Sequence, residues 1–143
     1  MTSEIITAPH NLEAEQAVIG GLLLDDDNSE RVQKVLAMLK PESFYGRAHQ
    51  IIFAEIRQMF RENKPVDGLT LFDSLESKGL AEQVGGFAYI GQLAKNTPSA
   101  ANIVAYAASV REAAMERYGI QRMTEATELL YARNGMSAVE KYE

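Results

Sequence analysis

Few side chains in this chain have the type and spacing that catalysis or metal binding requires. The chain contains no cysteine, which excludes thiolate catalysis and cysteine-ligated zinc. Its histidines, His10 and His49, are 39 residues apart in different predicted segments, so a histidine-rich metal site is not expected. His49 lies beside the apolar face of a predicted helix, where we interpret it as a capped or packed side chain. A pH switch or a ligand role is the less favoured alternative.

Carboxylates are more abundant, and the densest cluster is Asp25, Asp26 and Asp27. This cluster lacks the glycine and the terminal glutamate of a calcium-binding EF-hand loop, which favours a solvated acidic turn. The sequence also lacks the GxxxxGKS/T loop that cradles nucleotide triphosphates, the HExxH zinc motif and a recognisable Ser, His and Asp arrangement. We therefore predict no catalytic, cofactor-binding or metal-binding residue, and an independent enzyme is the least favoured class of function.

Composition favours one soluble globular domain with a protein partner. The chain has 143 residues, of which 46% are hydrophobic and 24% are charged. Its 14 Lys and Arg against 20 Asp and Glu give a net charge of −6, without the basic footprint of a nucleic-acid binder. The sequence has no apolar run long enough to span a bilayer, and its first residues do not resemble a signal peptide. We expect a cytoplasmic protein without membrane contact.

Apolar residues recur at intervals of three and four along almost the whole chain, which predicts an all-α fold. The third helix is expected over residues 47–62, and Gly79 is expected to end the fourth. The side chains expected to cap helices are Asn11 for the first, Asn28 or Ser29 for the second, and Thr70 with Asp73 for the fourth.

The predicted helices are expected to pack as a compact bundle. The side chains expected in its core, from the first and third helices, are Leu12, Ala17, Ile19, Leu23, Ile52, Phe53 and Ile56. The tandem Gly20 and Gly21 cost a helix about 1 kcal/mol per residue relative to alanine. We therefore expect another part of the chain to lie close to this helix at the two glycines.

The longest helical pattern covers residues 97–134, with Thr97 as the expected N-cap before Pro98. A continuous helix over residues 99–133 would be about 50 Å long. A compact domain of this size is under about 40 Å across. The end of the helix must therefore project from the bundle, or the helix must bend at Gly119.

Beyond Gly119 the pattern becomes a seam. Ile120, Met123, Thr127 and Leu130 repeat at three and four, close to the spacing of a coiled coil. A projecting helix with such a seam is unstable alone and requires a partner. Ser137 and Glu140 then have the spacing of a capping box, which predicts the start of another helix.

The same stretch does not favour DNA binding, because its basic residues alternate with acidic ones. The basic residues are Arg111, Arg117, Arg122 and Arg133, and the acidic residues are Glu112, Glu116, Glu125 and Glu128. Direct single-strand binding is therefore a minor hypothesis. Met115, Tyr118, Met123 and Tyr131 fit packing equally well within this chain and against another subunit.

Four segments of the chain, in this order and spacing, resemble the N-terminal domain of the bacterial and phage replicative DNA helicase DnaB. They are PHNLEAEQAVIGGLLLD (9–25), FYGRAHQIIFAEI (44–56), PVDGLTLFDSLESKG (65–79) and GGFAYIGQLAKNTPSAANIVAYAASVRE (85–112). The resemblance extends over residues 9–134. It implies a small all-helical bundle followed by a helical hairpin. In this family the domains pair through the hairpin and form a collar, a trimer of dimers, on a hexameric motor. The collar also docks primase and influences the helicase loader.

The residue pattern and the resemblance together predict three parts: a flexible N-terminal segment over 1–10, a globular bundle over 11–118, and the projecting helix with the start of a truncated hairpin over 119–143. The resemblance implies a homo-oligomer, with primase and loader as partners, and no catalytic residue here. ATP and magnesium would belong only to a motor domain that the sequence lacks, so we expect a piece of a longer protein. The residues expected at a subunit interface are Ile120, Met123, Thr127, Leu130 and Tyr131. The alternative is a stand-alone regulator that joins or blocks a host helicase hexamer.

Overall fold

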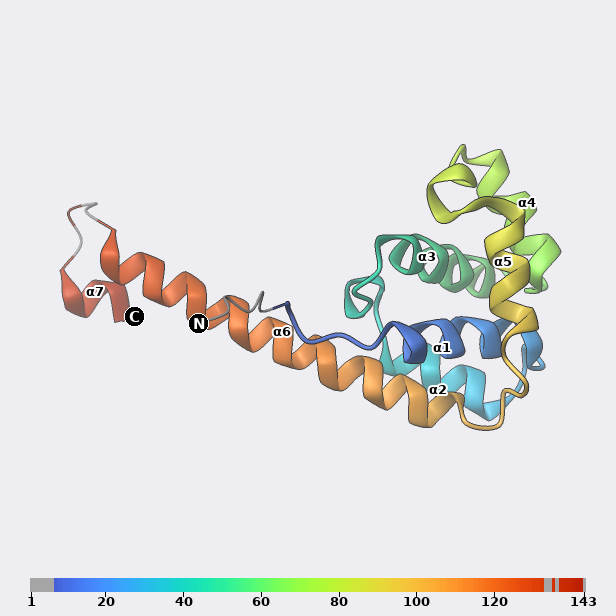
Figure 1. The fold of residues 1–143 in the computed structure, drawn as a ribbon, viewed down its shortest axis with the longest axis horizontal. Helices are drawn as coiled ribbons and strands as arrows, with labels where there is room; N and C mark the ends of the chain where they lie inside the picture. Colours follow the sequence, from blue (N-terminus) through green and yellow to red (C-terminus); the bar gives the residue numbers. More distant parts are fainter. Residues whose placement is uncertain (1–6, 133–134, 136, 143) are drawn as a thin grey trace, which may run out of the picture.

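A computed structural model describes residues 7–132, 135 and 137–142 of the chain as an assembly of helices (Figure 1). No strand is assigned among these residues, so the predicted all-α fold is confirmed. The helices and the two 3-10 turns are α1 (Leu12–Leu24), α2 (Glu30–Met38), η1 (Pro41–Ser43), α3 (Arg47–Arg61), α4 (Gly68–Ser77), η2 (Glu82–Val84), α5 (Gly86–Lys95), α6 (Ile103–Tyr131) and α7 (Ala138–Tyr142).

One hydrophobic core contains side chains from each of the helices α1, α2, α3, α4 and α5 and from the first part of α6. We call this unit the head. α1 lies at its centre and contacts α3, α5 and α6, while α2 packs on α6 and α4 packs on α3 and α5. Figure 1 shows α6 continuing far beyond the head, with α7 turned back beside its end. The largest fully buried side chains of the core include Ile19, Leu22, Phe44, Phe53, Leu71 and Ile103.

The start of α1 agrees with the predicted cap, because the Oδ1 of Asn11 accepts a hydrogen bond of 3.0 Å from the backbone N–H of Ala14. The prediction of Leu12 as core is wrong, since 40% of this residue is exposed. α1 packs against helices on several sides, so its buried positions do not form one stripe starting at Leu12. Ala17 is only partly buried, because it lies under a hollow between α1, α5 and α6.

The tandem glycines lie where another part of the chain approaches α1, as predicted. A Cβ on Gly20 would lie 1.9 Å from the Oγ1 of Thr97 and 2.3 Å from the carbonyl oxygen of Leu93. A Cβ on Gly21 would lie 2.0 Å from the Cγ2 of Ile103. No side chain fits at either position without movement of its neighbours, so the glycines allow the end of α5 and the start of α6 to pack on α1.

Thr97 is not the N-cap of the long helix, and that prediction is wrong. Its hydroxyl donates a hydrogen bond of 2.9 Å to the carbonyl oxygen of Leu93, and the residue is buried beside Gly20. The helix begins later, at Ile103, after a turn that includes Pro98. The local Thr-Pro signal was outweighed by a tertiary contact, because the threonine fills the space that Gly20 leaves open.

The cap of α4 also differs from the prediction of Thr70 with Asp73. The N-cap is Asp67: its Oδ1 accepts from the Thr70 N–H at 2.8 Å, and the Thr70 Oγ1 accepts from the Asp67 N–H at 2.9 Å. The threonine is therefore the third residue of the helix instead of its cap. Ser29 caps α2 as expected, and Gly79 follows α4 with a left-handed φ of +71°.

Candidate protein-interaction surface

The helix α6 has two parts with different surroundings. Its last buried side chain is that of Val110, which is 1% exposed, and every described residue after it is partly or fully exposed. The helix of 29 residues continues through Gly119 without a break, which gives a length of about 44 Å. Of the two predicted alternatives, the structure adopts the projecting helix. We call residues 111–119 the root of this projection. Residues 120–131 of α6, together with α7, are called the arm.

The arm carries the five residues predicted to lie at a subunit interface, and we call this set the seam: Ile120, Met123, Thr127, Leu130 and Tyr131. At 3.6 residues per turn they fall within an arc of about 100° on one face of the helix. Exposure is 52% for Ile120, 75% for Met123, 40% for Leu130 and 84% for Tyr131. Because the arm has no core of its own, these apolar side chains face solvent in the isolated chain.

The hydroxyl groups of Thr127 in the seam and of the neighbouring Thr124 are already hydrogen-bonded within the helix. The hydroxyl of Thr127 donates to the carbonyl oxygen of Met123 at 2.9 Å, and that of Thr124 donates to the carbonyl oxygen of Ile120 at 2.8 Å. With each hydroxyl turned back to its own backbone, no donor of the two threonines requires a partner elsewhere. A shallow hollow of about 310 Å³ lies between Ile120, Met123, Thr127 and the neighbouring Glu128. Its position along the helix suits a side chain from a second helix.

The remainder of the projecting helix is more polar. Met115 and Tyr118 are also exposed, but their helical positions place them away from the seam. The guanidinium of Arg122 lies over the Tyr118 ring, 6.0 Å from its centroid, and ion-pairs with Glu125 at 3.6 Å. One face of the arm is therefore apolar and unpaired, and the opposite face carries charges.

The turn from α6 into α7 has the predicted cap. The Ser137 N–H donates to the Glu140 carboxylate at 3.1 Å, and the Glu140 N–H donates to the Ser137 hydroxyl at 3.2 Å. The Lys141 ammonium donates to the carbonyl oxygens of Leu130 and Ala132, where a cation stabilises the end of α6. The predicted end of the long helical pattern, at residue 134, lies outside the described residues. The described part of the chain thus turns back into a second, antiparallel helix, as a helical hairpin requires.

A buried polar cluster inside the head was not anticipated from the sequence. The His49 Nδ1 lies 2.8 Å from the Glu15 Oε1, and its Nε2 lies 2.6 Å from the Tyr89 hydroxyl. The Glu15 carboxylate also accepts from the N–H groups of Tyr45 at 2.7 Å and Gly46 at 3.1 Å. Burial alone would raise the pKa of Glu15, but the hydrogen bonds from His49, Tyr45 and Gly46 together hold it below the usual value.

This cluster ties α1, α3 and the start of α5 together. Glu15 is 1% exposed and His49 is 4% exposed, which confirms that His49 is a packed side chain. No local pattern marks this cluster, because His49 is 34 residues from Glu15 and 40 residues from Tyr89 in the sequence. Glu15 had only the appearance of an acid in the first turn of a helix.

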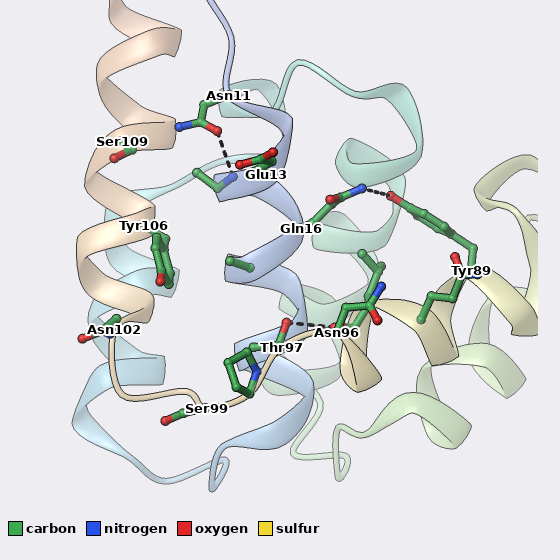
Figure 2. Close-up of a pocket in the computed structure, with 15 residues that line it drawn as sticks. Asn11, Glu13, Gln16, Tyr89, Asn96, Thr97, Ser99, Asn102, Tyr106 and Ser109 are labelled. Atoms are coloured by element: carbon green, nitrogen blue, oxygen red, sulfur yellow. Dashed lines mark hydrogen bonds between the residues drawn. The ribbon is translucent and has the colours of Figure 1, made fainter.

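A polar hollow of the head, about 540 Å³ in volume, lies between α1, α5 and α6 (Figure 2). Amide and hydroxyl side chains dominate its walls, and none of the described lining residues is basic. Figure 2 shows the Gln16 amide pointing to the Tyr89 hydroxyl, 3.3 Å away. The described residues contain no group of His, Asp and Glu that could hold a metal ion, and none of their helices is long and apolar enough to cross a membrane.

A helical head with a projecting arm, bearing an exposed apolar seam and the start of a hairpin, is typical of all-α domains that contact other proteins. Comparison with known proteins agrees with this architecture. Residues 7–112 match the family model described as the DnaB-like helicase N-terminal domain. The chain therefore belongs to the family of DnaB-like helicase N-terminal domains.

Individual relatives support the assignment. The replicative DNA helicase DnaB of Pasteurella multocida is 43% identical over 131 residues, which covers 92% of this chain and 27% of the relative. That of Haemophilus influenzae is 39% identical, covering 94% of this chain and 28% of the relative. The crystal structure of the N-terminal domain of DnaB helicase from Mycobacterium tuberculosis superposes with a TM-score of 0.88 at 34% identity, covering 95% of this chain and 93% of that one. The chain thus spans less than a third of the length of the two DnaB helicases from Pasteurella multocida and Haemophilus influenzae.

Proposed function

We propose that this chain serves as the collar domain of a replicative hexameric DNA helicase, and that it pairs with a second copy of itself through the seam. Family membership supports the class of parent protein, and one observation carries the pairing. This observation is the apolar face of a helix that projects from the head with no partner among the described residues. On this proposal the domain itself has no catalytic role. ATP, magnesium and unwinding belong to a motor domain of the parent protein.

The seam is large enough for a weak dimer. Burial of one large apolar side chain stabilises a complex by about 1.5 to 3 kcal/mol. Ile120, Met123 and Leu130 on each of two copies could therefore offset an association cost of about 4 to 15 kcal/mol with little surplus. We expect a dimer that dissociates on dilution, and a hexamer, as a trimer of dimers, only when the motor domain adds its own contacts.

Sedimentation equilibrium of this chain over a wide concentration range tests the pairing. We expect the mass to rise toward that of a dimer, and Leu130→Asp to keep the chain monomeric because it places a charge in the seam. Gln121→Asp is the matched control: it makes the same change of charge on the same helix, about half a turn away from Leu130. Identical masses for the original chain and both variants at every concentration would contradict pairing through the seam.

We further propose that the paired arms, together with the adjoining heads, are the docking surface for primase and for the helicase loader. The support is family membership alone, so binding requires a direct assay with purified partners. We expect primase to bind the dimeric chain and to bind Leu130→Asp more weakly. Equal binding to both would place the docking surface on the head.

We expect little or no binding of DNA by this domain. The ion pair of Arg122 with Glu125 neutralises part of the arm, and the chain has a net charge of −6. Titration of a labelled single strand at low and physiological salt tests this expectation. Salt-dependent binding tighter than about micromolar would contradict it.

A further inference from the structure

The direction in which the arm leaves the head must be set at the root, and the root lacks a hydrophobic core. Between Val110 and Ile120 the only side chains facing the head are partly buried, and two of them, Ala113 and Ala114, are small. The middle of the seam, at Thr127, lies about 25 Å beyond Val110 along the helix. A tilt of about 10° at the root would move it sideways by about 4 Å, close to half the spacing of two packed helices.

Arg117 is the side chain of the root with the most extensive contacts to the head. Its Nη1 donates to the carbonyl oxygen of Pro9 at 2.8 Å, and its Nη2 donates to that of Ser43 at 2.9 Å. Its guanidinium lies 5.5 Å from the centroid of the Tyr45 ring, which in turn stacks on the His10 ring at 4.3 Å. One side chain of α6 therefore holds the segment before α1 and the turn before α3. Figure 1 shows that first segment running beside α6.

The surface that Arg117 contacts is itself rigidly held. The backbone N–H groups of Tyr45 and Gly46 both donate to the buried carboxylate of Glu15, which also binds His49. The turn that carries Ser43 and Tyr45 is thus fixed to α1 and α3 inside the core. A continuous path of polar contacts runs from the core of the head to the root of the arm.

The two acceptors also explain why arginine suits this position. The carbonyl oxygens of Pro9 and Ser43 belong to segments 34 residues apart in the sequence, and both lie within reach of one guanidinium. The planar fork of arginine donates in two fixed directions at once, whereas a lysine ammonium at the end of a flexible stem lacks that geometry. Both acceptors are neutral, so the contacts do not rely on an ion pair that salt would screen.

We propose that Arg117 is the positioning residue of the arm, which fixes the angle between the head and the seam so that two seams can meet. This inference rests on the proposed pairing, but its first test does not require a dimer. When Arg117 is replaced, we expect the arm to sample several directions around the root. If about one molecule in ten then has the pairing direction, dimerisation weakens about tenfold for each copy, or about 100-fold in total.

The distance between head and arm can be measured directly, because the chain has no cysteine of its own. Spin labels on Glu76→Cys in α4 and Ala126→Cys in α6 report this distance by pulsed electron resonance. Leu130→Asp in the same chain keeps it monomeric. We expect one narrow distribution for this parent, a distribution at least twice as wide for Arg117→Ala, and an intermediate one for Arg117→Lys. An unchanged width in Arg117→Ala would overturn the proposal.

Two controls separate the possible causes of a broader distribution. Arg111→Ala removes another arginine of the same helix, which is exposed and forms no hydrogen bond or ion pair within the described chain, and should leave the width unchanged. Helix content and cooperative thermal unfolding should be retained in Arg117→Ala, while a broadening that accompanies general unfolding would count against a positioning role. Arg117→Lys, which retains the charge, gives a second reading if the alanine variant folds poorly.

Sedimentation of chains with an intact seam then links position to pairing. Dimerisation about 100-fold weaker in Arg117→Ala, with Arg111→Ala unaffected, supports the proposal. Unchanged dimerisation together with a widened distribution would overturn the role of Arg117 in pairing. If the original chain does not dimerise at all, the proposed function fails, but the width of the distance distribution still decides whether Arg117 fixes the arm.

Discussion

The head and the arm use the same kinds of apolar side chain in opposite surroundings. Ile19 and Phe53 are fully buried in the head, whereas Ile120, Met123 and Leu130 are exposed on the arm. The head therefore gains its stability from contacts within one chain. The arm can gain comparable stability only from another surface. The difference shows that apolar periodicity in a sequence predicts a helix face that will be covered, without telling which molecule covers it.

The largest expected difference between the two regions is in the cost of losing one large side chain. Phe53→Ala should lower the free energy of unfolding by about 4 kcal/mol, because it leaves a cavity in a packed core. Met123→Ala should lower that of the monomer by less than about 0.5 kcal/mol, because the side chain is already in solvent. Chemical denaturation at low protein concentration measures both. Similar losses would contradict the division into a self-sufficient head and an unsupported arm.

The second-largest loss of stability is expected when the buried polar cluster of the head loses its carboxylate. Glu15→Ala should destabilise the chain by about 3 kcal/mol, because it removes the acceptor for two backbone N–H groups and for His49. Glu13→Ala is the matched control, since Glu13 lies in the same first turn of α1 and is exposed. We expect a change of only a few tenths of a kcal/mol there. Equal effects of the two substitutions would mean that the buried cluster contributes little.

Replacing a glycine by alanine is expected to change stability in opposite directions in the head and in the root. Gly20→Ala should destabilise the head by about 2 kcal/mol or more, because its Cβ would overlap Thr97 and the backbone of Leu93. Gly119→Ala should instead stabilise the helix by about 0.5 to 1 kcal/mol, because nothing lies within 4 Å of its Cβ position. Thermal unfolding of both variants measures these changes. Destabilisation by Gly119→Ala would indicate that the root is bent or closely packed in solution.

The pH is expected to have a smaller effect on the stability of the head, through the carboxyl group of Asp25. Hydrogen bonds from Arg31, Ser29 and the Asp26 N–H lower the pKa of Asp25 from 3.8 to about 2. A group whose pKa is lowered by folding stabilises the folded state above its unfolded pKa, and this contribution disappears as the pH falls through the folded value.

Since Arg31 is solvated, we expect Asp25→Asn to cost about 1 kcal/mol at pH 6 and almost nothing near pH 2. Asp73→Asn, at an exposed position of α4, is the control for a change of charge. Unfolding curves at several pH values measure the difference. A cost of Asp25→Asn that does not vary with pH would rule out the ion pair as its source.

Most of the helical content could be predicted from the sequence, because helix starts and stops depend on neighbouring residues. Asn11, Ser29 and the pair of Ser137 with Glu140 cap helices as predicted. The prediction of Thr97 as an N-cap was wrong because its hydroxyl fills the space beside Gly20, a contact between residues far apart in the sequence. The prediction of Leu12 as a core residue was wrong because several helices pack on α1, so the buried side chains do not follow a single stripe.

The candidate surface could be predicted in part, and for a similar reason. The members of the seam lie within a few helical turns of one another, so their spacing reveals a common face. The contacts of Arg117 with Pro9 and Ser43 span 108 and 74 residues, and no local pattern marks them. Arg117 therefore had only the appearance of one basic residue among several on a charged helix. The position of the arm relative to the head required the folded chain.

Chemical protection of the seam tests the central claim most directly, whatever the orientation of the two copies. A single cysteine is introduced as Thr127→Cys in the seam or as Gln121→Cys outside it, about a third of a turn from Thr127 around the helix. The rate of alkylation by iodoacetamide is then measured as the protein concentration rises. We predict that the seam cysteine reacts more slowly at high concentration while the cysteine at position 121 reacts at a constant rate. Rates that are independent of concentration at both positions would contradict pairing of the chain through its arm.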